Sequence, residues 1–201
     1  MESLQALVAA SPRATVDGQW QRHAAARYAS EVLNGRKGDG RWGTEHGFPV
    51  LYLGQPLDSV VVEAYRHLVD PVDDPALART LRPRVLVTCS VAVTEILDLR
   101  LSSTRLQVGL SLDVLQSPTD DRDAYSQCQH IAQVAHQLGF HGIIAPAATR
   151  IGATLALFTD RLPPPEVPVR VCADQWWTEL PADPRIPTVS SLRLVRDGDQ
   201  S

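Results

Sequence analysis

The order of apolar segments along the chain is the feature that most restricts its fold. Short apolar runs typical of buried strands occur at 48–54, 84–88, 141–145, 154–158 and 167–172. A doubly wound parallel sheet requires a helix after nearly every strand, and this regular alternation is missing. The sequence therefore predicts one mixed α+β domain over residues 1–201, with short mixed strands and a few helices. Seven of the fifteen prolines lie in 163–187, so the segment 162–201 is expected to pack against this domain instead of forming a second one.

Two segments of helical periodicity interrupt the apolar runs. The first covers residues 58–69, with Asp58 as its expected N-cap, and the second covers residues 126–139. Ser126 and Gln129 match the S-x-x-Q pattern of a capping box. Ser126 is therefore expected to begin the second helix.

Composition and charge exclude several classes of protein. Of the 201 residues 44% are hydrophobic, and a net charge of −4 argues against the basic surface that nucleic-acid binding requires. The N-terminal sequence does not resemble a signal peptide, and no apolar run is long enough to cross a membrane. Three widely spaced cysteines and six scattered histidines lack metal-ligand spacing. We expect a cytoplasmic protein without a metal site and without direct binding to nucleic acid or membranes.

A glycine-rich stretch lies within residues 19–44, which are expected to form an extended loop. Its segment GDGRWG, residues 38–43, matches the G-x-G-x-x-G dinucleotide fingerprint, and Glu63 follows twenty residues later. That fingerprint must follow a strand and open a helix, whereas here a polar segment precedes it and a strand follows. The glycines instead indicate a loop that places Arg41 and Trp42 at a cleft, or a surface loop with Trp42 in the core.

Taken singly, the candidate site residues have simpler explanations. Glu63 can form a surface ion pair with Arg66 or His67, three and four residues further along the helix. Tyr52 is compatible with an ordinary core aromatic residue. Ser126 is explained by helix capping alone.

Taken in order, several motifs resemble the RES-domain family. They are WQRH (20–23), GDGRWG (38–43), FPVLYLG (48–54), VVVEAYRHL (60–68), YSQCQ (125–129), GFHGIIAPAA (139–148) and LALF (155–158). The resemblance covers about residues 15–160. Its most specific part is the combination of G-R-W, a short strand containing Tyr52, and Glu63 eleven residues after that tyrosine.

The resemblance implies a fold, an activity, a partner and a set of site residues. RES proteins are toxins of RES–Xre toxin–antitoxin pairs, they resemble ADP-ribosyltransferase domains, and they destroy NAD+ by hydrolysis or phosphorolysis. It therefore implies NAD+ as substrate, phosphate as one of two acceptors, no further cofactor, and an Xre-type antitoxin as partner. The matching residues are two NAD-binding arginines, a pocket tyrosine, an essential acid and a serine near the long helix: Arg22, Arg41, Tyr52, Glu63 and Ser126.

The chemistry of NAD+ agrees with these roles. The nicotinamide–ribose bond joins a cationic leaving group to a carbon that can become an oxocarbenium ion, so a carboxylate at Glu63 would stabilise the developing charge. Arg22 and Arg41 would hold the pyrophosphate through charge-assisted hydrogen bonds. Tyr52 would orient the nicotinamide ring, and Ser126 would contact the adjacent ribose or the amide.

The chain departs from the family pattern in one loop. Many members have Pro-Ser-Ala-Arg where this chain has Pro-Ala-Ala-Thr at 146–149, so a polar contribution there is missing or comes from Thr149 or Arg150. His23 stands at a position where an aromatic residue occurs in the family. Two alternatives stay open, transfer of ADP-ribose to a protein target and a non-catalytic nucleotide-binding or interaction module. The sequence also leaves open the acceptor, the antitoxin's identity and whether the protein forms homo-oligomers.

Overall fold

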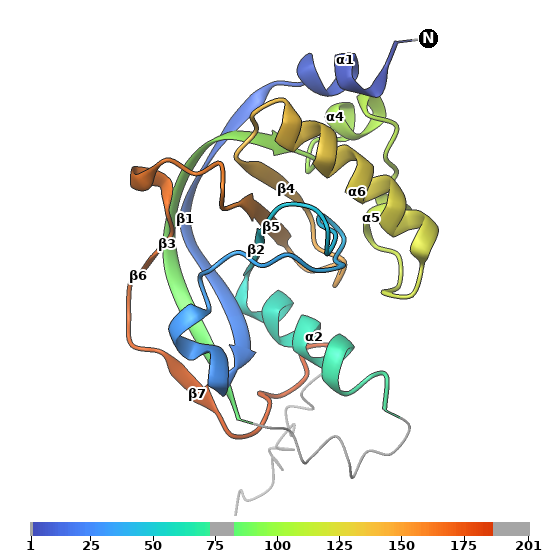
Figure 1. Ribbon diagram of the computed structural model, residues 1–201. Helices are drawn as coiled ribbons and strands as arrows, with labels where there is room; N and C mark the ends of the chain where they lie inside the picture. Colours follow the sequence, from blue (N-terminus) through green and yellow to red (C-terminus); the bar gives the residue numbers. More distant parts are fainter. Residues whose placement is uncertain (1, 73–82, 187–201) are drawn as a thin grey trace, which may run out of the picture.

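The structure, a computed structural model, is a strongly curved sheet with helices packed against it (Figure 1), and it describes residues 2–72 and 83–186. The strands are β1 (Arg13–Ala25), β2 (Val50–Gln55), β3 (Arg84–Asp98), β4 (Gly142–Pro146), β5 (Ala153–Phe158), β6 (Val169–Arg170) and β7 (Gln175–Trp177). The helices are α1 (Leu4–Ala9), α2 (Leu57–Leu68), α4 (Ser102–Gln107), α5 (Leu112–Leu115) and α6 (Arg122–Gln137), with 3₁₀ turns η1 (Ala26–Glu31) and η2 (Pro164–Glu166). This mixture confirms the predicted α+β fold class.

Five of the strands close into a ring. Their order is β1-β2-β5-β4-β3, and β3 pairs again with β1. Within the ring β3 and β4 run parallel, while the other neighbours are antiparallel. A core cluster joins apolar residues from all five strands, among them Trp20, Leu53, Val91, Ile144 and Leu155. The ring gives the functional residues on β1 and β2 a rigid support.

The longest strands were not expected from the sequence. β1 has 13 residues and β3 has 15, and they pair antiparallel from Arg13 opposite Leu97 to Ala25 opposite Arg84. The expectation of short strands is therefore wrong for this pair. The expected loop over 19–44 is also wrong in its first part, because residues 19–25 belong to β1. The glycine-rich stretch itself lies between η1 and β2, where the backbone forms turns and isolated bridges.

Both expected helices are present, but their N-terminal caps differ from the prediction. Asp58 lies in the first turn of α2, and the cap position is Pro56. Helix α6 begins at Arg122, where the Asp121 side chain accepts a hydrogen bond from the backbone N–H of Ala124 at 3.0 Å. The predicted capping role of Ser126 is therefore wrong.

The helices pack on different parts of the sheet. α6 contributes Cys128, Ile131 and Ala135 to a core cluster that also contains Phe140 of the following loop. α2 packs through Val61 and Ala64 in a second cluster with Leu86 and Trp177. In Figure 1 the loop before β2 lies between α6 and α2. This arrangement brings three segments that are distant in sequence to one place.

The described part of the proline-rich segment lies along β3. β6 and β7 pair antiparallel with the first half of that strand. Further on, the Tyr65 hydroxyl donates a hydrogen bond to Pro181 O at 2.9 Å, and Arg185 pairs with Asp70 at 2.6 Å. These contacts connect residues 169–185 to α2, the helix that carries Glu63.

Candidate active site

A cavity of about 440 Å³ opens where β1, β2, α2 and the glycine-rich loop meet. Its wall includes Arg22 from β1, Arg41 from the loop, Tyr52 from β2 and Glu63 from α2. The structure therefore brings four of the five sequence-predicted site residues together. Arg22 and Glu63, the outermost of the four in the sequence, are separated by 41 positions along the chain.

Ser126 is the predicted residue that lies elsewhere. It is exposed on α6 and lines a second cavity, of about 690 Å³, on which Lys37, His46 and Gln129 also lie. Its neighbour Tyr125 lines the first cavity instead. Because α6 begins four residues earlier than expected, Ser126 lies in the second turn and does not line the cavity that holds the other four residues.

Arg22 is a half-buried cation whose Nη1 donor is buried and unused. Among the residues that the structure describes, its Nη1 atom has no hydrogen-bond partner. Burial and the nearby Arg36 lower the pKa of its guanidinium below the ordinary value. A buried donor without a partner is costly, and the side chain that carries it lines the cavity. The arrangement suits an anionic group that enters the cavity from solution.

Arg41, in contrast, uses both terminal nitrogens of its guanidinium for contacts with the protein. Its Nη1 donates to Val114 O at 2.7 Å and to Ser117 Oγ at 3.1 Å, and its Nη2 donates to Ser117 O at 2.8 Å. The guanidinium also lies over the Tyr125 ring, 4.5 Å from its centre. Arg41 thus anchors the segment before α6 to the wall of the cavity, and its fork is not free for a ligand.

Tyr52 connects β2 to the glycine-rich loop. Its hydroxyl accepts a hydrogen bond from the Trp42 backbone N–H at 2.9 Å. Burial raises the pKa of this phenol well above its ordinary value, so it stays protonated and can still donate. A Cβ atom at Gly40 would lie 2.6 Å from the same hydroxyl. Only glycine allows this close approach, and Trp42 beside it is 1% exposed, as one of the two sequence interpretations expected.

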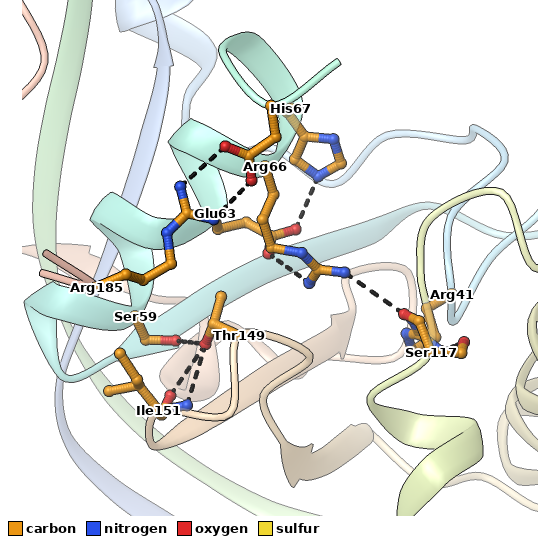
Figure 2. Close-up of polar contacts among 10 residues, drawn as sticks. Arg41, Ser59, Glu63, Arg66, His67, Ser117, Thr149, Ile151 and Arg185 are labelled. Carbon is orange, nitrogen blue, oxygen red and sulfur yellow. Dashed lines mark hydrogen bonds and ion pairs between the residues drawn. The ribbon is translucent and has the colours of Figure 1, made fainter. Parts of the chain in front are cut away.

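Glu63 combines the two roles considered for it. Its carboxylate pairs with His67 Nε2 at 2.7 Å and with Arg66 Nη1 at 3.3 Å, as shown in Figure 2, and it also lines the cavity. Burial would raise the pKa of this carboxyl, but the hydrogen bond and charge of His67 and the charge of Arg66 outweigh burial and lower it. Glu63 is therefore an ionised carboxylate at neutral pH.

The loop that departs from the family pattern does supply a polar group. Thr149 lines the cavity, and its hydroxyl lies 2.8 Å from Ser59 Oγ of α2 (Figure 2). The Thr149 hydroxyl also donates to Ile151 O at 3.2 Å. Of the two residues considered for this loop, Thr149 is the one at the cavity wall. Arg150 is not among the lining residues.

His23 also lines the cavity, although sequence reasoning gave it no role. Its Nδ1 accepts a hydrogen bond from Arg84 Nε at 2.9 Å, and its ring lies nearly parallel to that of Trp177, with the ring centres 6.0 Å apart. Sequence reasoning also missed Ser59 and Tyr125 as wall residues. Tyr125 was within a quoted motif, whereas no local pattern connects Arg84 or Trp177 with His23.

Residues 2–72 and 83–186 hold neither a metal-binding cluster nor a membrane-spanning helix. No group of three or more histidine, cysteine, aspartate or glutamate side chains there is arranged to hold a metal ion. No helix in that part of the chain is long and apolar enough to span a membrane.

Comparisons with known proteins agree with the sequence motifs. Two similar curated proteins are the NAD(+) phosphorylases MbcT of Mycobacterium bovis and Mycobacterium tuberculosis, each 28% identical over 141 residues, covering 69% of this chain and 72% of the relative. The fold matches a chain in the crystal structure of the M. tuberculosis MbcT–MbcA toxin–antitoxin complex, with a TM-score of 0.73 and 24% identity over 89% of this chain and 93% of that one. The model of the RES domain matches residues 12–180. The chain therefore belongs to the RES-domain family.

Proposed function

We propose that this protein is an NAD+-degrading enzyme that cleaves the nicotinamide–ribose bond, and that it acts as the toxin of a toxin–antitoxin pair in the cytoplasm. The observation that carries the proposal is one cavity lined by an ionised carboxylate, Glu63, and by a half-buried cation, Arg22, whose Nη1 has no partner among the described residues. The match to the RES family and the similarity to NAD(+) phosphorylases MbcT support it.

Glu63 supplies the negative charge that bond cleavage requires. Nicotinamide leaves with the electron pair of the C–N bond, so positive charge develops on the ribose carbon and its ring oxygen. A carboxylate that is already ionised and held by His67 and Arg66 stabilises this charge without having to reorganise. The lowered pKa of Glu63 suits this electrostatic role better than that of a general acid.

The other wall residues bind and orient the substrate. Arg22 offers its free Nη1 to a pyrophosphate oxygen. Tyr52 presents a neutral ring and hydroxyl to the nicotinamide side of the substrate. Arg41 contributes positive charge and holds the wall, a different role from the bidentate grip expected from the sequence. Ser126 has no part in this proposal because it lines the other cavity.

We infer phosphate as the acceptor that captures the ribose carbon. A phosphate oxygen forms the new C–O bond as the C–N bond breaks, so the products are nicotinamide and ADP-ribose 1″-phosphate. The name of the similar relatives, NAD(+) phosphorylase, supports phosphate over water. NAD+ and phosphate then meet the chemical needs of the reaction without a further cofactor.

The test is incubation of the purified full chain with NAD+ labelled in the adenosine part. Chromatography should show free nicotinamide and a labelled small-molecule product, and Glu63→Gln should slow the formation of both by about 10²-fold or more. Glu45→Gln is a matched control, because Glu45 is an exposed residue whose carboxylate pairs with His46 and which does not line the cavity. Label on protein would instead indicate ADP-ribose transfer, and no nicotinamide release by a folded protein would indicate a non-catalytic module.

We further propose an antitoxin protein as partner, because the structurally similar MbcT chain was crystallised with the antitoxin MbcA. The Xre type of the partner comes from the family resemblance alone. A cognate antitoxin that covers the cavity should block NAD+ cleavage at a stoichiometric ratio. Cleavage that continues in the purified complex would show that the partner neutralises the toxin by another route.

A further inference from the structure

The contact between Arg84 and His23 fixes the protonation pattern of a cavity residue. Arg84 lies at the start of β3 and does not line the cavity, whereas His23 on β1 does. Arg84 Nε donates to His23 Nδ1 at 2.9 Å. Since an arginine can only donate, Nδ1 must be the acceptor, and a neutral His23 carries its proton on Nε2.

The surroundings of His23 keep the ring neutral. Burial and the Arg84 charge lower the pKa of His23 to about 3, with His67 and Arg22 acting in the same direction and Glu63 opposing them. These charged and titratable groups come from β1, β3 and α2. The fourth neighbour, Trp177 of β7, is parallel to the ring and carries no charge. His23 is therefore a neutral Nε2–H donor throughout the pH range from 5 to 8.

We propose that Arg84 is a positioning residue, which holds His23 as a fixed Nε2–H donor for an acceptor oxygen of the bound nucleotide, on a ribose hydroxyl or a phosphate. The proposal rests on the proposed function only for the identity of the ligand. Since Arg66 already places a positive charge beside Glu63, a neutral His23 avoids adding a further cation that would oppose the positive charge developing on the ribose. His23 thereby donates a hydrogen bond without adding a cation to the reacting centre.

The first test needs no variant and no activity. In the full chain labelled with ¹⁵N-histidine, two-bond ¹⁵N–¹H correlation spectra report which ring nitrogen carries the proton. His23 should show a protonated Nε2 and an unprotonated Nδ1, unchanged from pH 8 to pH 5. A proton on Nδ1, or titration of His23 within this range, would overturn the proposal even if the protein degrades NAD+.

The second test removes the Arg84 contact. In Arg84→Met, His23 should show averaged tautomer signals and a higher pKa, and the KM for NAD+ should rise about threefold to tenfold, the loss expected for one hydrogen bond. The deficit should grow as the pH falls from 8 to 5.5, because the ring then becomes protonated. His23→Phe, which keeps the aromatic ring, should show the same KM effect without this added pH dependence.

The matched control is Arg161→Met, which removes the contact of Arg161 Nε with His136 Nε2 at 3.4 Å, away from this cavity. It should change the His136 signals alone and leave NAD+ cleavage unchanged. Normal NAD+ kinetics with an unchanged pH profile in folded Arg84→Met would show that Arg84 does not position His23. Absence of NAD+ cleavage in the unmodified chain would contradict the proposed function, while the tautomer measurement would still decide the role of Arg84.

Discussion

Arg22→Met is predicted to weaken substrate binding while leaving the protein as stable as before, or more stable. The Nη1 atom is buried and has no partner among the described residues, so the substitution removes an unsatisfied donor without breaking a hydrogen bond of that atom. Relief of such a donor is worth about 1 kcal/mol or more. For a chain of this size, that corresponds to a rise in Tm of roughly 2–4 °C.

Binding should change in the opposite direction. If Nη1 donates to a pyrophosphate oxygen, the lost charge-assisted hydrogen bond is worth about 1.5–3 kcal/mol, which corresponds to roughly a 10- to 100-fold higher KM for NAD+. Thermal unfolding followed by circular dichroism and initial rates of nicotinamide release measure the two effects. A fall of several degrees in Tm with an unchanged KM would refute this reasoning, because Arg22 would then be a structural residue.

Three further substitutions separate structural from chemical roles. Arg41→Met should lower Tm by roughly 6–12 °C, because it removes three hydrogen bonds to residues 114–117 that together are worth about 3 kcal/mol. Calorimetry measures the change, and an unchanged Tm would contradict the anchoring role of Arg41. Glu63→Gln should keep the fold and lower kcat by about 10²-fold or more, measured by nicotinamide release. In the unmodified protein, the lowered pKa of Glu63 means that its ion pairs stabilise the fold above the ordinary glutamate pKa and lose this effect as the pH falls through the lower, folded value. Melting temperatures of wild type and Glu63→Gln from pH 7 to pH 3 measure this. A loss of Tm in wild type alone already above pH 5 would contradict it. Gly40→Val should displace the Tyr52 hydroxyl and reduce kcat/KM by about tenfold or more. Gly38→Val serves as the control, because a Cβ there meets no atom within 4 Å. Equal rates in both variants would show that the close approach of Gly40 to Tyr52 is unimportant.

The sequence motifs located most of the cavity because they lie on elements with strong local signals. The apolar run before Gly54 formed β2, and the periodic segment around Glu63 formed α2. α2 follows β2 directly in the chain, and Tyr52 and Glu63 line the same cavity.

Other features depend on contacts that no local pattern shows. β1 is 13 residues long because it pairs along its length with β3, about 70 residues away. The start of α6 was missed because its first two residues, Arg122 and Asp123, are charged and exposed, and the clear run of apolar residues at helical spacing begins only at Cys128 and Ile131. The prediction therefore placed Ser126 at the N-cap, whereas it lies in the second turn of α6. The partners of Arg41 lie at 114–117, which is why its engagement with the protein was not foreseen.

Phosphate-dependent cleavage of NAD+ is the measurement that tests the central claim most directly. The purified full chain is mixed with NAD+ at a series of phosphate concentrations, with the ionic strength held constant because salt screens the arginine contacts. ³¹P NMR follows the phosphorylated product, and chromatography follows nicotinamide. The proposed function predicts a rate that rises with phosphate, together with equal amounts of nicotinamide and ADP-ribose 1″-phosphate. Intact NAD+ at every phosphate concentration, with a folded protein, would contradict it.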